Sequence, residues 1–191
     1  MDLSYEGVKK IYSDKGFPFD ERIFGINILG IRKSLHDSNL FDDTCIIAYK
    51  TTKDNVCLEF DKFTTEPGYY FLKVKFMNPK GCAWVKEGYY PKLWTNGLHG
   101  EKQYPALIQY SPITVYRDTN MDEVLDNSGG EETGMFGIDF HHGYNCTLVY
   151  NNSAGCQVLE NIADLAQVLP LFQLHERTYG KGISYALIDS F

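Results

Sequence analysis

Short apolar runs rich in β-branched and aromatic residues, each bounded by polar turn residues, restrict the fold of this 191-residue chain more than any other feature. Four of them read INILGIRKS, TCIIAYKTT, NVCLEFDKF and YPALIQYSPITVYRD. Runs of this length and composition are typical of strands. The polar turn Lys53-Asp54-Asn55 joins the second run to the third, and Pro112 divides the fourth into a pair.

The same pattern predicts strands in five further segments, which read EPGYYFLKVKF, GCAWVKEGYYPKLW, GMFGIDFHH, CTLVYN and ISYALID. The polar, glycine-rich stretch from Asp126 to Gly134 predicts a loop or hinge. Aromatic residues make up 15% of the chain, which suits a β-rich domain. We therefore expect many antiparallel strands, with Trp84 and Trp94 in the core.

Helical spacing is confined to two segments. The first spans Leu3 to Ser13 and is expected to end at Gly16 and Pro18. The second follows Cys156, and Pro170 should kink or split it. Its apolar residues recur at helical intervals: Val158, Ile162, Leu165, Leu169 and Phe172.

These elements predict a mostly-β α+β domain with a short N-terminal helix and one helix near the C-terminus. We place a helical extension at residues 1–25 and the main domain at residues 26–191. The formal net charge is −7 and lysine and arginine form no block, so nucleic acid is not an expected partner. No segment approaches the roughly 18–20 apolar residues of a membrane helix, and no signal peptide is recognisable.

Metal binding is not expected from the cysteines, because none of the five forms a Cys-x-x-Cys pair. Cys146 is expected on a strand with a structural role. The stretch from Asp118 to Asp126 superficially resembles a calcium loop, but Glu123 replaces the required glycine, so a turn is the better interpretation. The cysteines in apolar runs are expected to be small buried residues: Cys45, Cys57 and Cys82.

The segment HHGYNCTLVYNNSAGCQV, residues 141–158, could bring a histidine and a thiol together. Gly155 would allow a tight turn whose backbone N–H groups face an oxyanion. The following helix, expected to begin within a few residues, and a nearby imidazolium would lower the pKa of the Cys156 thiol. The alternative is an incidental buried cysteine beside a strand.

The stretches GIDFH and SAGCQV resemble the Ser-x-Gly-Cys signature of L,D-transpeptidase-like cysteine enzymes, which act on peptidoglycan stem peptides. The ordered series INILGIRKS, FDDT, TTEPGYYFL, NPKG, GLHGEKQYPALIQ, VYRDTNMDEVLD, TGMFGIDFH and SAGCQV is similar to phage-encoded members within or near that family. The resemblance runs from about Ile26 onward. It implies a β-sandwich or barrel-like catalytic domain and requires no metal or organic cofactor.

The resemblance assigns Cys156 as nucleophile and His141 as general base, with Ser153 and Gly155 forming the turn and the Gly155 and Cys156 amides as oxyanion donors. His142 is the rival base, although neighbouring residues on a strand face opposite sides. Substrate contacts are expected from four residues: His99, His142, Asn152 and Gln157. For His99, a surface loop position without a role is the alternative.

Many transpeptidases have histidine where this chain has Ala154, and arginine or asparagine shortly after the cysteine, where Gln157 stands. The spacing of fifteen residues between His141 and Cys156 is also short for the bacterial enzymes. These departures argue against transfer, and we expect a hydrolase in the manner of a phage endolysin or virion-associated peptidase.

The expected partners are bacterial peptidoglycan and other virion proteins. The protein would reach the cell wall or periplasm from the virion or through a holin pore. The alternatives are an inactive virion structural or wall-binding protein, and a cysteine acyltransferase or transpeptidase.

Overall fold

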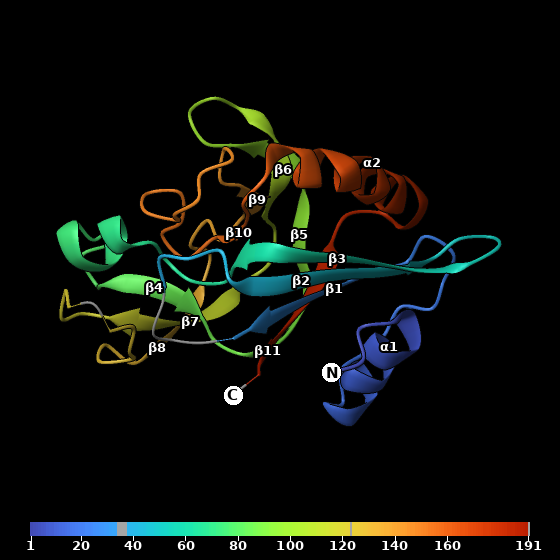
Figure 1. Ribbon diagram of the computed structural model, residues 1–191, viewed down its shortest axis with the longest axis horizontal. Helices are drawn as coiled ribbons and strands as arrows, with labels where there is room; N and C mark the ends of the chain where they lie inside the picture. Colours follow the sequence, from blue (N-terminus) through green and yellow to red (C-terminus); the bar gives the residue numbers. More distant parts are fainter. Residues whose placement is uncertain (34–37, 123, 191) are drawn as a thin grey trace.

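The computed structural model describes residues 1–33, 38–122 and 124–190. Figure 1 shows a sheet-dominated molecule with helices at opposite sides. In chain order the elements are α1 (Tyr5–Asp14), β1 (Ile26–Arg32), β2 (Asp43–Lys50), β3 (Asn55–Thr64), the π-helix η1 (Tyr70–Val74), β4 (Cys82–Val85), β5 (Gly88–His99), β6 (Tyr104–Gln109), β7 (Ile113–Asp118), β8 (Glu131–Gly134), β9 (Phe140–His142), β10 (Gln157–Leu159), α2 (Ile162–Tyr179) and β11 (Ile183–Asp189).

Eight strands form a closed ring in the order β1-β11-β5-β6-β9-β10-β3-β2, and β4-β7-β8 form a separate small sheet. Most neighbours are antiparallel, but β1 runs parallel to β11 and β9 runs parallel to β10. The architecture confirms the predicted mostly-β α+β class, with a short helix at the start and a long helix near the end.

Strand β1 is buried on both faces, which explains why its sequence does not alternate between apolar and polar residues. All seven residues of β1 are buried. Ile28 faces the interior of the ring, whereas Leu29 and Ile31 face α1 on the outside. A strand covered on both faces carries apolar residues on both, and its two polar residues, Asn27 and Arg32, are buried with hydrogen bonds to the main-chain oxygens of Ala48 and Val85.

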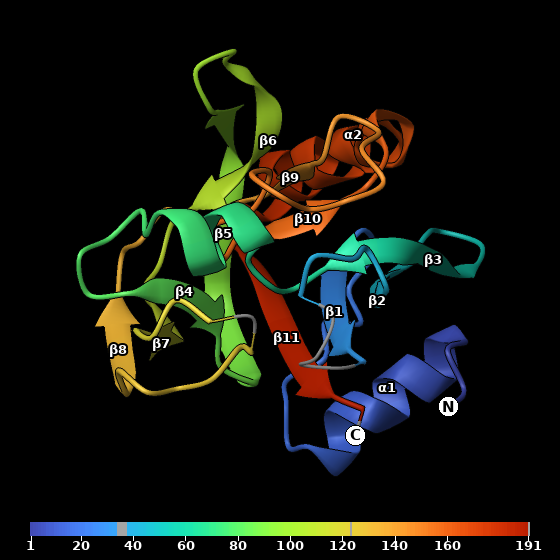
Figure 2. The same ribbon diagram turned by 60° about the vertical axis from the view of Figure 1, so that its left-hand side comes forward.

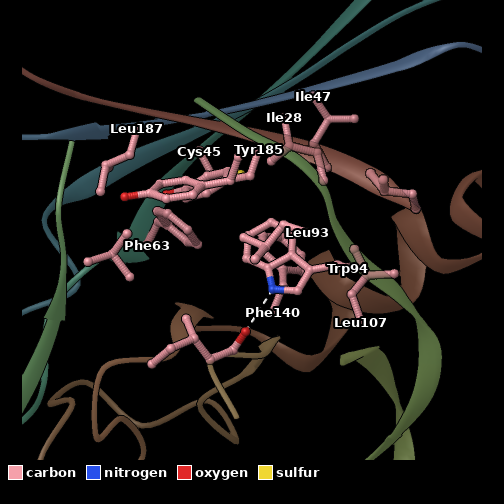
Figure 3. Packing of buried hydrophobic residues seen from close by; sticks show 14 of the residues in the cluster. Ile28, Cys45, Ile47, Phe63, Leu93, Trp94, Leu107, Phe140, Tyr185 and Leu187 are labelled. Carbon is pink, nitrogen blue, oxygen red and sulfur yellow. Dashed lines mark hydrogen bonds between the residues drawn. The ribbon is translucent and has the colours of Figure 1, made fainter. Parts of the chain in front are cut away.

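The interior of the ring is filled by large apolar side chains, and α2 contributes to it. Phe140 lies between Trp94 and Phe172, with ring centroids 5.5 and 5.9 Å away. The Trp94 indole Nε1 donates to the main-chain oxygen of Ile138 at 2.8 Å, as Figure 3 shows. This bond ties the segment before β9 to the core and so helps to position the candidate site.

The N-terminal helix packs on the outer face of the ring, seen below β1 and β2 in Figure 1 and confirmed by the view in Figure 2. Ser4 caps α1 by accepting from the Gly7 N–H. Tyr5, Val8 and Tyr12 are buried against Leu29, Ile31 and Ile46 in a cluster separate from the interior core. Helix and ring therefore share one outer apolar layer.

Two predicted strands are wrong. In EPGYYFLKVKF, residues Tyr70–Val74 form the π-helix, which buries Leu72 against Cys82 and Trp84 and packs Phe71 at the edge of the same cluster. CTLVYN is a loop whose only described pairing is an isolated bridge at Leu148. Cys146 is accordingly exposed rather than part of a strand.

Other boundaries also differ from the sequence-based expectation. GCAWVKEGYYPKLW contains two strands, β4 and the start of β5, and GMFGIDFHH is a strand only at its end, in β9. The predicted loop from Asp126 to Gly134 includes β8. Ser34, at the end of the first predicted run, and Glu123 lie outside the described residues.

The segment after Cys156 departs most from the sequence-based expectation of a helix within a few residues. Strand β10 follows Cys156 directly, and α2 begins only at Ile162. The helix N-terminus is thus not adjacent to the thiol, and its dipole, which acts within about one turn, does not explain thiol chemistry there. Pro170 neither splits nor ends α2, because it is exposed and water can reach the freed carbonyl on that side.

No described helix combines the length and hydropathy that a membrane crossing requires.

Candidate active site

A constrained turn carries the candidate nucleophile. Ser153 is buried, and its hydroxyl accepts from the Gly155 N–H at 3.1 Å and donates to the Cys156 carbonyl at 2.9 Å. Gly155 has φ +119°, and a Cβ there would lie 2.7 Å from the main-chain oxygen of Ala83. Only glycine fits such a position without displacing its neighbour, which accounts for the Ser-x-Gly-Cys pattern.

Strand pairing brings together the segments that carry Cys156 and His141. β10 pairs with β9 in parallel, with Gln157 opposite Phe140 and Val158 opposite His141. His141 shares its face with its register partner Val158, and Cys156 packs against the cluster that contains Val158. Cys156 lies just before β10, and the hydrogen-bond partners of its Sγ among the described residues are backbone groups of Gly137 and Asp139 rather than His141.

The imidazole of His141 is oriented by a main-chain carbonyl. Its Nδ1 lies 3.0 Å from the carbonyl oxygen of His142 and 3.1 Å from the Tyr104 hydroxyl. A carbonyl only accepts, so this contact assigns the proton to Nδ1 and leaves a lone pair on Nε2. Nε2 is buried and has no hydrogen-bond partner among the described residues. Burial lowers the pKa of His141 to about 3, so the ring is neutral.

The thiol of Cys156 lies against the backbone before β9. Its Sγ accepts from the Asp139 N–H at 3.5 Å and donates to the Gly137 carbonyl at 3.4 Å. Burial, and then the Asp139 carboxylate, raise the pKa of Cys156 to about 12. The expectation of a lowered thiol pKa is therefore wrong: without an adjacent helix N-terminus or imidazolium, desolvation dominates.

A second imidazole stands beside the first. His99, at the end of β5, stacks on His141 with ring centroids 4.0 Å apart and an interplanar angle of 14°. Its Nδ1 lies 2.7 Å from the Asp139 carboxylate, whose other oxygen accepts from the Gln109 N–H. His99 thus belongs to the candidate site, whereas its predicted substrate contact stays a prediction.

Asp139 and Tyr104 were not identified from the sequence. Asp139 lies two residues before His141, and this alternation in GIDFH was an available signal. Tyr104 comes from β6, and no local pattern connects it with β9. Burial raises its pKa, so the phenol stays protonated.

The other residues predicted to contact substrate, His142 and Asn152, differ in their surroundings. His142 is buried, stacks on Tyr104 at 4.2 Å, and its Nδ1 accepts from the Tyr144 N–H, so that nitrogen is not available as a base. Asn152 is half-buried in the turn before Ser153, where its role stays a prediction.

Gln157 is fully buried, on the face opposite Cys156. Its amide Nε2 donates to the carbonyls of Thr65 and Gly155, each at 3.3 Å, and its Oε1 accepts from the Tyr185 hydroxyl at 2.5 Å. A substrate contact is therefore not assigned to Gln157. Its bond to Gly155 instead holds the turn from behind.

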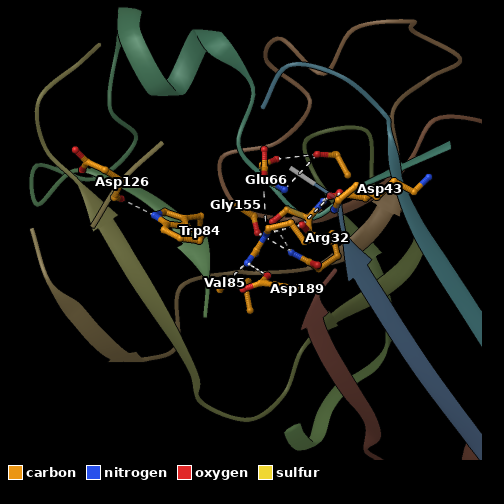
Figure 4. Close-up of polar contacts among 12 residues, drawn as sticks. Arg32, Asp43, Glu66, Trp84, Val85, Asp126, Gly155 and Asp189 are labelled. Atoms are coloured by element: carbon orange, nitrogen blue, oxygen red, sulfur yellow. Dashed lines mark hydrogen bonds and ion pairs between the residues drawn. The ribbon is translucent and has the colours of Figure 1, made fainter. Parts of the chain in front are cut away.

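The hydrogen bonds of Gln157 to Thr65 and Gly155 belong to a buried polar network, which Figure 4 shows. The Arg32 guanidinium donates to the Thr65 hydroxyl at 3.0 Å, to Asp189 at 3.0 Å and to the Val85 carbonyl at 2.7 Å. Burial raises the pKa of Glu66, at the edge of this network, to about 9, so its carboxyl is protonated at neutral pH. The network stabilises the base of the turn.

The two predicted oxyanion donors, the N–H groups of Gly155 and Cys156, differ in whether they are free to bind an oxyanion. The Gly155 N–H is engaged by Ser153 Oγ and is not available in this structure. The Cys156 N–H therefore remains the main-chain donor that we assign to an oxyanion, as a prediction.

No group of three or more His, Cys, Asp or Glu side chains among the described residues is arranged to hold a metal ion. In the loop after β7, Asp118, Asp122 and Asp126 accept from nearby backbone N–H groups, which is the predicted turn geometry.

No protein-family model matches the chain. A search of curated proteins also finds no significant match.

Proposed function

We propose that this protein is a cysteine peptidase that cleaves peptidoglycan stem peptides through a thioester intermediate. The observation that carries the proposal is the buried Nε2 of His141, which has no partner among the described residues, on a histidine whose register partner Val158 belongs to the cluster against which Cys156 packs. The resemblance of GIDFH and SAGCQV to L,D-transpeptidase-like enzymes supports the substrate class. A phage-encoded enzyme of this kind would act on the wall from the virion or after holin-dependent release.

The reaction begins from a neutral pair. Cys156 Sγ attacks the carbonyl carbon of the scissile peptide bond while its proton moves to His141 Nε2. The carbonyl oxygen becomes an oxyanion that accepts from the Cys156 N–H. The C–N bond then breaks, the amine leaves with the proton from His141, and a thioester remains.

Water completes the cycle. His141 Nε2 takes a proton from the water as the water oxygen attacks the thioester carbon, then the C–S bond breaks and the same proton passes to Sγ, which releases a carboxylic acid and restores the thiol. Another amine in place of water would give transpeptidation. The main-chain carbonyl of His142 serves as the third group, because it holds the imidazole in the required tautomer.

One observation favours a different function. The pKa of Cys156 is raised and its Sγ is hydrogen-bonded to backbone groups, which also suits a protein that has this fold but no catalytic activity. A virion structural or wall-binding protein is therefore the second candidate.

Digestion of purified sacculi separates the two. We expect the wild-type protein to release stem-peptide fragments identifiable by mass spectrometry, and Cys156→Ala to release none. His141→Gln should lower the rate by roughly 10²–10⁴-fold, the usual contribution of a general base. Cys146→Ala is the matched control, because that cysteine is exposed in the loop and has no assigned role. Absence of new fragments from the wild type would leave the structural candidate.

A further inference from the structure

The histidine that stacks on His141 is held by a carboxylate rather than by the main chain. His99 Nδ1 lies 2.7 Å from one carboxylate oxygen of Asp139, and the other oxygen accepts from the Gln109 N–H at 2.8 Å. An ionised carboxylate only accepts, so Nδ1 carries a proton and a neutral His99 has its lone pair on Nε2. The carboxylate thus fixes the tautomer and the orientation of this imidazole, as it does in an Asp–His pair of a hydrolase.

The two imidazoles differ in their access to water. The His99 side chain is 23% exposed, whereas His141 is 2% exposed and its Nε2 is enclosed. Nε2 of His99 bonds to no described residue and is not among the buried unpartnered atoms. His99 therefore offers a hydrogen-bond acceptor to water in a site whose other imidazole is covered.

Stacking holds the two rings close enough to contact one small molecule. Their centroids are 4.0 Å apart and their planes are inclined by 14°. Hydrogen bonds extend over about 2.7–3.2 Å. Acceptors on rings at this separation can therefore share a single water molecule, which has two hydrogens to donate.

Asp139 also connects this histidine with the thiol. Its N–H donates to Cys156 Sγ at 3.5 Å, and its carboxylate holds His99. One residue thus contacts both the atom that would carry the acyl group and the imidazole that is open to water. A thioester on Cys156 would form beside His99.

We propose that His99 binds the water molecule that hydrolyses the thioester. This inference rests on the proposed peptidase function and concerns the fate of its intermediate, hydrolysis rather than transfer. One hydrogen of the water bonds to His99 Nε2, and the other faces His141 Nε2. The water oxygen attacks the thioester carbon, the proton that faces His141 moves to that ring, and the C–S bond breaks as this proton passes on to Sγ. His99 neither gains nor loses a proton, because its part is to hold the water in place.

Covalent capture on purified sacculi tests this assignment. The acyl part of a cleaved stem peptide remains linked to the glycan, so an enzyme that stops at the thioester stays attached when the sacculi are boiled in detergent. His99→Phe keeps an aromatic ring against His141 and removes Nε2. We expect it to slow hydrolysis of the thioester by roughly tenfold to a hundredfold, the cost of a misplaced reactant, and to be captured in greater amount than wild type. Cys156→Ala should not be captured.

Hydroxylamine separates water binding from a purely structural role. Its nitrogen attacks the thioester carbon and breaks the C–S bond to give a hydroxamate, without need of a bound water. It should therefore release captured His99→Phe and restore repeated turnover of this variant. Glu101→Gln, exposed at the tip of the same hairpin, is the matched control and should behave like wild type.

A second variant keeps the test decisive if His99→Phe fails to fold. Asp139→Asn keeps the size of the side chain but no longer fixes the tautomer of His99, so it should also be captured and also be released by hydroxylamine.

Capture of a folded variant at the wild-type level would overturn the role of His99, and so would loss of fragment release without capture. The proposed peptidase function would survive either result if the wild-type protein still releases fragments from sacculi. A wild-type protein that releases none would remove that function itself, so the two failures are distinguishable.

Discussion

Burial governs the two groups on which the proposed chemistry depends. It raises the pKa of Cys156 to about 12 and lowers that of His141 to about 3. The neighbours reinforce both shifts, because the Asp139 carboxylate opposes a thiolate and a charged His99 would oppose a second imidazolium. At neutral pH the pair is therefore uncharged, and proton transfer has to accompany formation of the C–S bond.

This charge state predicts how Cys156 reacts with iodoacetamide. Only the thiolate is alkylated, so the rate at Cys156 should rise by roughly tenfold per pH unit from pH 7 to 10, without a plateau. Labelling is followed by mass spectrometry in a Cys146→Ser background, because the exposed Cys146 would otherwise compete. A plateau near neutral pH that disappears in His141→Gln would instead reveal a thiolate–imidazolium pair and contradict the neutral pair.

At the same scale, sequence reasoning reached only part of the site. Cys156 and His141 are recognisable because short motifs carry them. His99 and Tyr104 reach His141 from the β5–β6 hairpin, and Asp139 gains its importance from His99. Such contacts depend on which strands become neighbours, and a single sequence does not state that.

Elements were predictable where one local rule decides them. Strands β1, β2 and β3 follow from apolar runs and the turn at residues 53–55. The segment Tyr70–Val74 has the aromatic composition of a strand, yet tertiary packing of Leu72 makes it helical. The loop before Ser153 contains Val149, which is buried against Phe41 beside the isolated bridge between Leu40 and Leu148.

The turn between this loop and β10 predicts a mutational effect. Gly155→Ala must place a Cβ at φ +119° against the Ala83 carbonyl, so we expect a loss of roughly 1–3 kcal/mol in unfolding free energy and a decrease in sacculus cleavage. Gly130→Ala is the matched control, since its φ is +76° but nothing lies within 4 Å of the added Cβ. Equal losses in chemical denaturation of the two variants would show that contact with Ala83 does not matter.

At the scale of the whole molecule, ring closure joins the two ends of the chain. β11 lies between β1 and β5, and its pairing with β1 is parallel. The sequence predicted both strands but not this pairing, because partners more than 150 residues apart leave no local pattern. β1 therefore lies inside the ring with both edges paired, and its faces are covered by the interior core on one side and by α1 on the other.

The outer cover should therefore contribute to the stability of the entire ring, although residues 1–25 read as an extension in sequence. Val8 is fully buried at the centre of the α1 contact. Val8→Asp places an unpaired carboxylate there, and detaching α1 costs less free energy than keeping this charge buried. Detachment of the helix would expose Leu29, Ile31 and Ile46. We expect a loss of at least 2 kcal/mol in unfolding free energy, since burying one such side chain contributes about 1.5–3 kcal/mol, together with aggregation detectable by light scattering. Lys10→Asp, on the exposed side of the same helix, should change stability by less than about 1 kcal/mol. If the two variants unfold alike, α1 is an appendage, and the ring is stable without it.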